Sequence, residues 1–364
     1  MNRRSLAGSP RRRVAPRSFA TVLCLLAGAT ALAPRGAAAH ARWFAGDGPF
    51  QAVEWDRLNS LPVMLALTSG AATVAALMAG QRLTGDPLWP RPPVFQRLEP
   101  SVAAILGVQT AIAMIFAASR LNLFVPNIEL PHNALGVLIA GVVVVAAFSF
   151  ITGVLTRVGA AVTVGLFLLA FAVAPWYEAL EQVIFVGIAF YLAAVGRGVV
   201  RYDGGADADR GPLTDRMLPY ALPTLRIAAG LSVLVLGFTE KLINVDLGMA
   251  FLEAYPHFNV AREAGITWFT DERFVYAIGI AEATAGIALL CGCLTRVVIL
   301  ALWIPFNLGI AFLPAEELIG HLPILSTMYV LLVRGTEGIP PPAPGTSQAN
   351  VAEPTQRPST AVTA

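Results

Sequence analysis

The chain has 364 residues, of which 56% are hydrophobic and 13% are charged. Soluble domains carry roughly 25% charged residues, so this composition excludes a soluble globular fold and indicates a protein that crosses a lipid bilayer several times. The net charge of +2 says little about partners, and no surface pattern of arginines and aromatic residues supports a nucleic-acid role, so nucleic acid is not expected as a partner. Long continuous apolar runs favour transmembrane helices over a closed barrel, so the predicted fold is an all-α polytopic bundle.

Residues 1–39 have the layout of a signal peptide. Six arginines precede residue 18, the apolar stretch SFATVLCLLAGATALA follows, and Ala37–Ala39 form an A-x-A cleavage site. A second interpretation, in which this segment stays attached as an anchor helix, is left open by the sequence.

Cleavage after Ala39 would make His40 the first residue of the mature chain. Its α-amine and one imidazole nitrogen could then chelate Cu(II) from a single residue. The mature start HARWF resembles that of periplasmic copper proteins, which implies copper as a cofactor. The alternative is that a histidine is merely tolerated after the cleavage site.

Nine apolar segments of the mature chain are long enough, or nearly so, to span a bilayer as helices, because about 20 apolar residues cross the hydrocarbon core. They are Leu61–Gly80, Ser101–Ser119, Ala134–Thr152, Val158–Ala174, Glu181–Gly196, Leu222–Thr239, Phe274–Leu294, Val297–Leu313 and Leu318–Val333.

These spans divide the chain into parts. Residues 40–96 hold an outer N-terminal segment, the first span and a basic loop, and residues 97–198 form a four-helix unit. A polar cytoplasmic linker, 199–220, leads to a second four-helix unit, 221–335. The tail, 336–364, is rich in proline and poor in apolar residues and is predicted to be disordered.

Arginine-rich loops predict the orientation of the spans. Placing them in the cytoplasm puts Arg82–Arg97, Arg157, Arg197–Arg216, Arg296 and Arg334 on one side, in agreement with a single alternating path. We therefore expect a multi-pass protein of the bacterial plasma (inner) membrane, with its N-terminus outside and its C-terminus in the cytoplasm. All four histidines then fall on the outer side.

The two four-helix units are related by an internal repeat. A shift of 139 residues places Ile151–Arg157 (ITGVLTR) on Leu290–Arg296 (LCGCLTR), and the same shift places Gly196 on Gly335. Because each unit has an even number of spans, the repeats run parallel. This arrangement weakens the case for an alternating-access transporter, although some transporters also contain parallel repeats.

The copies differ where chemistry is expected. Upstream of the matched segments, Arg120 lies near Lys241 after a small change of shift. The position of Glu282 in the second unit is taken by Val143 in the first. The second unit therefore holds the polar candidates.

Lys241 and Glu282 are the leading candidates for functional residues, and each belongs to a stripe of residues along one face of a predicted helix. The stripe on the sixth span is Arg226, Gly230, Gly237 and Lys241, and the stripe on the seventh is Gly279, Glu282 and Gly286. Small residues let membrane helices approach closely, so we expect the stripes to face each other or the bundle interior. Lys241 is the only lysine in the chain, and we predict that it pairs with Glu282 in the outer half of the bundle.

Such a pair has two interpretations. It can relay a proton or hydrogen-bond a quinone head group, as buried ionisable groups in membranes commonly do, with Glu282, Lys241 and Arg226 as the catalytic residues. Alternatively, it only fixes the register of the two helices.

The outer-side histidines are candidates for a metal site. Glu317 and His321, one turn apart at the start of the last span, can share a metal ion or a proton, although acidic residues there also suit the helix dipole. His257, in the long outer loop after Lys241, could converge with them. The metal-ligand candidates are therefore His40, His257 and His321.

Cys291 and Cys293 form a C-G-C sequence at the inner end of the seventh span. No second cysteine pair completes a four-cysteine zinc site, and a cytoplasmic position argues against a structural disulfide. We interpret both cysteines as packing residues.

The second unit carries a recognisable order of residues: an Arg and a Gly early in the first helix, a Lys at its end, then a Glu, two Gly and a Thr-Arg pair, at Arg226, Gly230, Gly237, Lys241, Glu282, Gly286, Gly292, Thr295 and Arg296. Over Leu222–Gly335 this order resembles the DoxX family of four-helix membrane proteins, so the chain looks like a tandem DoxX-like repeat. DoxX-like proteins include the small subunit of a thiosulfate:quinone oxidoreductase.

Three functions follow from these patterns. The DoxX resemblance implies a membrane subunit of a quinone-linked oxidoreductase system, with quinone as cofactor and a redox-enzyme subunit as partner in the lipid bilayer. His40 favours instead a periplasmic copper-handling membrane protein. The third is a transporter or a structural membrane anchor for a partner protein.

Overall fold

The computed structural model describes residues 53–196, 212–310 and 315–336, and these residues form helices joined by turns and loops, with no strand among them. The first unit and the segment before it contain η1 (Trp55–Asn59), α3 (Leu61–Thr84), α4 (Val94–Leu98), η2 (Glu99–Ser101), α5 (Val102–Ser119), α6 (Ala134–Thr152), α7 (Thr156–Val173), α8 (Trp176–Glu181) and α9 (Val183–Val195). The second unit contains α10 (Pro212–Gly237), η3 (Phe238–Leu242), α11 (Val245–Ala254), η4 (Pro256–Phe258), α12 (Val260–Glu263), α13 (Asp271–Cys291), α14 (Thr295–Ile310) and α15 (Ala315–Arg334).

Seven helices within the described residues are long and apolar enough to cross a membrane: Leu61–Thr84, Val94–Ser119, Ala134–Thr152, Thr156–Val173, Trp176–Val195, Leu213–Leu242 and Asp271–Cys291. The chain is therefore a multi-pass helical membrane protein, and the predicted all-α bundle is confirmed. The last two predicted spans coincide with α14 and α15. The apolar part described for α15, Leu318–Arg334, is shorter than the other seven.

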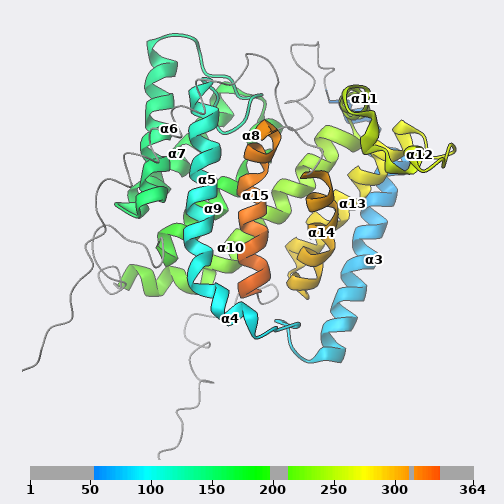
Figure 1. The fold of residues 1–364 in the computed structure, drawn as a ribbon, viewed down its shortest axis with the longest axis horizontal. Helices are drawn as coiled ribbons and strands as arrows, with labels where there is room; N and C mark the ends of the chain where they lie inside the picture. The colour runs from blue at the N-terminus through cyan, green and yellow to red at the C-terminus, as the bar shows by residue number, and fades with distance from the viewer. Residues whose placement is uncertain (1–52, 197–211, 311–314, 337–364) are drawn as a thin grey trace, which may run out of the picture. The chain divides into compact units, whose positions relative to one another are not determined.

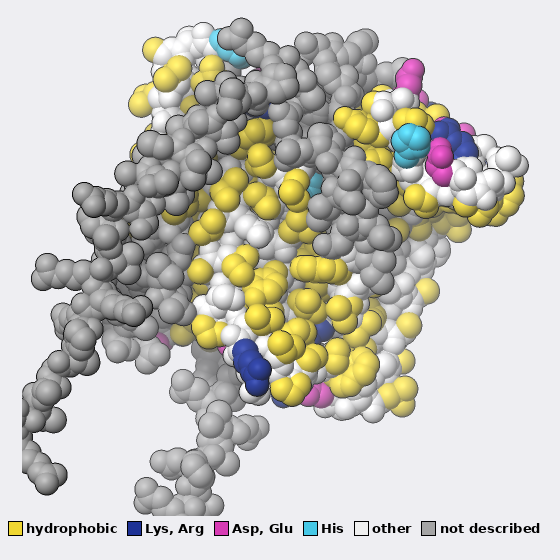
Figure 2. Space-filling view, in the orientation of Figure 1, with side chains coloured by type: hydrophobic (Ala, Val, Ile, Leu, Met, Phe, Trp, Pro, Cys, Tyr) yellow, Lys and Arg dark blue, Asp and Glu magenta, His cyan; other side chains and the backbone are white. Residues whose placement is uncertain are grey.

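Large apolar side chains cover the outside of several helices, as expected where lipid replaces water. On α6, Leu138 is 65% exposed and Val145 is 70% exposed. In Figure 2, hydrophobic side chains spread over the visible helices, whereas charged side chains lie mainly on the projecting α11–α12 region and at the lower edge of the view. This distribution fits a bundle that presents its apolar faces to hydrocarbon.

The two units contact each other reciprocally. Helix α10, the first of the second unit, packs along α9, the last of the first unit, and α5 packs along α15 in the same way. The additional helix α3 packs along α13. In Figure 1, α10 crosses behind α5 and α15, while α3 lies at the edge of the bundle. The interface between the units is thus made by their first and last helices.

The repeated turns adopt the same backbone conformation in both units. Gly153 and Gly292 end α6 and α13 with φ angles of 79° and 76°. The leucines two residues later, Leu155 and Leu294, have φ angles of 51° and 44°, a left-handed conformation that is uncommon for a branched side chain. The repeat seen in the sequence is therefore also a repeat of local structure.

An arginine in each unit ties this turn to the end of the unit's last helix. Arg157 Nε donates to the carbonyl of Ala193 at 3.3 Å, and Arg296 Nε donates to the carbonyl of Leu332 at 2.9 Å. Cations suit the carbonyl end of a helix, where backbone oxygens lack intrahelical donors. The shared Thr-Arg pair thus has a structural role in both copies.

Helix α10 begins earlier than expected. Pro212 and Pro219 lie within the predicted linker 199–220, yet Pro219 lies inside the helix, as does Pro223 of the predicted span. Proline suits the first turn of a helix, where its missing N–H has no partner to lose. The two interior prolines each remove a backbone hydrogen bond, and packing along α9 stabilises the helix despite that loss.

Candidate functional site

Helix α10 ends in a π-helical turn, η3, which spans Phe238–Leu242 and is closed by the Ile243 N–H donating to the carbonyl of Phe238 at 3.0 Å. Thr239, Glu240 and Leu242 are buried in this turn. An α-helix turns successive side chains by about 100°, so it would direct one of two adjacent residues away from the bundle. Such π turns are rare and occur frequently at functional sites.

Glycines bring α10 and α13 into backbone contact just before this turn. A Cβ atom added to Gly237 would lie 3.1 Å from the carbonyl oxygen of Gly279, and one added to Gly286 would lie 2.7 Å from the Leu234 nitrogen. A Cβ atom on Gly279 would lie 2.9 Å from the Cβ of Lys241. The two glycine stripes therefore face each other, as predicted, and they set the separation of the two helices.

The predicted ion pair is present. Lys241 Nζ lies 2.9 Å from Glu282 Oε2, and each side chain is 20% exposed. The same Nζ lies 3.7 Å from Oε2 of Glu240, whose side chain is only 3% exposed. Two carboxylates thus share one ammonium. Glu240 was absent from the sequence-based candidates, because a regular helix would not direct it towards the same partner as Lys241.

The first unit adds a third carboxylate to the site. Thr239 Oγ1 donates to Glu181 Oε1 at 2.6 Å, and Ser232 Oγ donates to the Glu181 carbonyl oxygen. Glu181 ends the short helix α8 and is 2% exposed. We call Glu181, Thr239, Glu240, Lys241 and Glu282 the buried ion cluster. It lies where α8 of one unit meets α10 of the other.

Aromatic residues lie beside the cluster. The Trp55 ring stacks on Trp176 with centroids 5.5 Å apart, and Tyr177 meets Trp55 edge-on at 5.7 Å. Tyr177 also packs on the apolar group that contains Leu242 and Ile243. Tryptophan and tyrosine gather at membrane interfaces, so this end of α8 fits the boundary between hydrocarbon and water.

The segment before α3 closes over the π turn. The Glu54 N–H donates to the carbonyl of Ile243 at 2.9 Å, and Arg57 Nη1 donates to the Tyr276 hydroxyl of α13 at 3.1 Å. Arg57 Nε also donates to the Glu54 carboxylate, and this hydrogen bond raises the pKa of Arg57 above its usual value. The additional span is thereby attached to the second unit at the cluster.

Arg226 is not part of the cluster. It precedes Lys241 by some four turns of α10, or roughly 20 Å along the helix. Its guanidinium is fully buried, and Nη1 donates to the carbonyls of Leu289 and Leu290 in the last turn of α13, the latter at 2.8 Å. The structure therefore separates this predicted catalytic residue from the other two and places it at a helix end.

Of the three predicted metal ligands, the structure describes two, His257 and His321. His40 lies outside the described residues, as does the side chain of Glu317. His257 is 79% exposed and its Nδ1 lies 3.7 Å from Glu263 Oε1. Across the described ranges, no group of three or more His, Cys, Asp or Glu side chains is arranged to hold a metal ion. Metal binding by His40, His257 and His321 stays a prediction.

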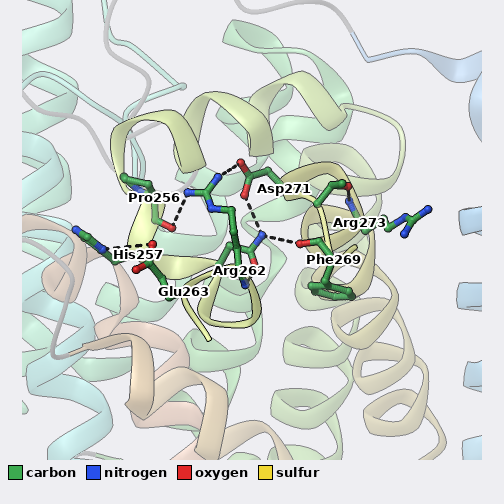
Figure 3. A network of polar contacts seen from close by, with 9 residues as sticks. Pro256, His257, Arg262, Glu263, Phe269, Asp271 and Arg273 are labelled. Atoms are coloured by element: carbon green, nitrogen blue, oxygen red, sulfur yellow. Dashed lines mark hydrogen bonds and ion pairs between the residues drawn. The ribbon is translucent and has the colours of Figure 1, made fainter. Parts of the chain in front are cut away.

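Polar contacts around His257 fix the loop between η3 and α13 (Figure 3). Arg262 binds the Asp271 carboxylate and the Pro256 carbonyl, and Asn259 Nδ2 donates to Asp271 Oδ1 at 2.9 Å. The loop is thus held at the first residue of α13. Arg262 and Asp271 therefore have partners within the loop itself.

The buried ion cluster is therefore the strongest candidate site in the part of the chain that the structure describes. Comparisons of this chain with family models, curated proteins and solved structures gave no match. Its chemistry has to be inferred from the geometry: carboxylates and an ammonium, held at the contact of two units, can accept, hold and pass protons.

Proposed function

We propose that this protein is a membrane subunit of a quinone-linked oxidoreductase system in the bacterial plasma membrane, and that the buried ion cluster exchanges protons with the quinone head group. One observation carries the proposal: two carboxylates share the single lysine of the chain inside an apolar bundle. Lys241 Nζ lies 2.9 Å from the Glu282 carboxylate and 3.7 Å from the Glu240 carboxylate.

Electroneutrality supports proton binding by this trio. With Glu240, Lys241 and Glu282 all ionised, the three groups carry one uncompensated negative charge. An unpaired buried charge is costly, by several kcal/mol on most scales, and Glu181 adds a third carboxylate beside these groups, so the cluster favours the binding of a proton. Reduction of a quinone to a quinol consumes two electrons and two protons, and a buried proton donor fits that need.

Exposure distinguishes the two carboxylates. Glu282 and Lys241 are each 20% exposed, whereas Glu240 is 3% exposed. We assign Glu282 the contact with the head group and Glu240 the role of holding Lys241 in place. The resemblance to DoxX-like proteins, which rests on Arg226, Lys241 and Glu282 among others, supports a redox partner.

The test uses the full chain, purified from its native membrane with bound partners and placed in lipid nanodiscs. Thiosulfate serves as donor and a short-chain ubiquinone analogue as acceptor, and quinone absorbance reports the rate. Glu282→Gln is expected to lower the turnover number by about 100-fold, the usual contribution of a positioned proton donor, at unchanged protein level.

Glu253→Gln is the matched control, since Glu253 lies exposed on α11 and outside the cluster. It should leave the turnover number unchanged. Full activity of both Glu282→Gln and Lys241→Met would reject the proposal and leave the ion pair with a purely structural role.

A further inference from the structure

The turn between α13 and α14 brings two thiols together. Cys291 and Cys293 are free cysteines, both partly exposed, and their Sγ atoms lie 3.4 Å apart. That separation is sulfur–sulfur contact, although a disulfide bond needs about 2.05 Å. Two thiols in contact can be oxidised to one disulfide bond. Two cysteines that pack apart from each other cannot.

A buried guanidinium lies against the glycine between them. A Cβ atom added to Gly292 would lie 2.5 Å from Arg226 Cζ and 2.9 Å from Arg226 Nη2. Gly292 also has a φ of 76°, which L side chains rarely adopt. The residue is therefore required twice, for the turn and for the space that Arg226 occupies beside the two cysteines.

Part of this guanidinium has no partner. Nη1 donates to backbone carbonyls of Leu289 and Leu290, but Nε and Nη2 are buried without a hydrogen-bond partner among the described residues. Arg226 is 0% exposed. Leaving buried donors of a charged group unsatisfied is unfavourable, so the surroundings of Arg226 favour an anion. The thiolate of a neighbouring cysteine is the anion at hand.

We propose that Cys291 and Cys293 form a redox-active dithiol whose thiolate is stabilised by Arg226. Reactive cysteines lie in partly exposed, electropositive surroundings. Both cysteines are partly exposed, and burial raises the pKa of the Cys293 thiol to about 11, a rise that the adjacent Arg226 guanidinium opposes. The substrate class is a disulfide, either a small molecule or a protein. This inference does not depend on the quinone proposal, and the two are tested by separate readouts.

The step is a thiol–disulfide exchange. One cysteine thiolate attacks a sulfur of the substrate disulfide, forming a mixed disulfide and releasing the first substrate thiol. The second cysteine, as thiolate, attacks the Sγ atom of the first cysteine, which forms the Cys291–Cys293 disulfide, breaks the mixed disulfide and releases the second substrate thiol. The pair loses two electrons and two protons, and the substrate disulfide gains both. Arginine-rich loops predict a cytoplasmic position for this turn, where disulfides are typically transient and catalytic.

The experiment uses the full chain in native lipid nanodiscs, with Cys24→Ser in every variant so that only the pair carries thiols. Samples are equilibrated in glutathione buffers of graded oxidation, quenched with acid and labelled with a maleimide mass tag. We expect both tags to disappear together, with a mass loss of two hydrogens. In Cys291→Ser, Cys293 should instead retain a glutathione adduct.

The role of Arg226 has its own readout, the rate of alkylation of the reduced pair at neutral pH. Arg226→Gln is expected to slow it about tenfold through the lower thiolate fraction, and Arg226→Lys should restore most of the rate. Arg157→Gln, which also removes a helix-capping guanidinium but belongs to the other unit, should not change it.

Three results would overturn the proposal. The first is a pair that stays fully reduced at every glutathione ratio. The second is an alkylation rate equal in Arg226→Gln and the parent chain. The third is protection from the tag that a metal chelator removes, which would assign the thiols to a metal ion instead.

Discussion

The two units differ most at the end where α8 lies. In the first unit, α5 ends at Ser119 as an ordinary α-helix, and the following Arg120 lies over the Phe116 ring at 4.3 Å. In the second, α10 continues into the π turn and buries Glu240 beside Lys241. The capping turns at the opposite end of each unit are alike. Capping is thus common to both copies, whereas the lysine and the two carboxylates that share it belong to the second unit alone.

The position of Glu282 makes this contrast informative. Its counterpart in the first unit, Val143, is fully buried and apolar. A helix of this fold therefore packs well with valine there, and the carboxylate is not needed for packing. A carboxylate inside a membrane helix is energetically unfavourable, so its presence at a position where valine is sufficient for packing is better explained by function than by stability.

Val143→Glu is expected to have the largest effect. It buries a carboxylate where the chain has no second lysine to pair with it, at a cost of about 2.5–3.5 kcal/mol for a charge at a helix centre. The yield of monodisperse protein from detergent-extracted membranes should fall strongly. Glu282→Val should retain its yield, because Lys241 keeps Glu240. Equal losses in the two variants would contradict a special environment for Glu282.

Gly286→Ala is expected to have the second-largest effect on stability. Its Cβ would lie 2.7 Å from the Leu234 nitrogen and 2.8 Å from the Gly230 oxygen, both backbone atoms that cannot move aside. Overpacking of this kind costs about 1–3 kcal/mol. Gly141→Ala in α6, where no atom lies within 4 Å, should be neutral. Thermal unfolding followed by circular dichroism compares the two, and similar melting temperatures would disprove a tight α10–α13 contact.

Substitution by glycine at the two repeated leucines, Leu155 and Leu294, should change the melting temperature in opposite directions. Glycine relieves the left-handed strain at both, worth about 1–2 kcal/mol. Leu155 is 67% exposed, so Leu155→Gly loses little packing and should be neutral or stabilising. Leu294 is 5% exposed, so Leu294→Gly loses a buried side chain, about 2–5 kcal/mol, which the relief of strain reduces to a net destabilisation of about 1–3 kcal/mol. Melting temperatures that move in the same direction would show that burial is not what separates the two turns.

Thr239→Val is expected to have the smallest effect. It keeps the shape of the side chain but removes the hydrogen bond to Glu181, and the net contribution of such a hydrogen bond to stability is about 0.5–1.5 kcal/mol. A double-mutant cycle with Glu181→Gln measures the coupling. Strictly additive effects would remove Glu181 from the cluster.

Much of the fold and part of the site follow from local patterns. Continuous apolar runs predict the spans, since the bilayer demands a fixed helix length. The 139-residue shift predicts the repeated turns, and the glycine spacing predicts the contact of α10 with α13. With Lys241 and Glu282 on those same faces, their pairing needs nothing beyond helical periodicity.

Other features arise only when distant segments pack together. The π turn shifts the helical phase by one residue and buries Glu240, which regular periodicity cannot anticipate. Glu181 enters the cluster because α8 of one unit lies against α10 of the other, a contact between residues far apart in the chain. Arg226 shares a helix face with Lys241, yet its side chain caps α13 beside Cys291 and Cys293. Helical periodicity determines which residues share one face of a helix. The residues that they contact depend on which other helices pack against that face at each position along it, and that is set by the tertiary structure.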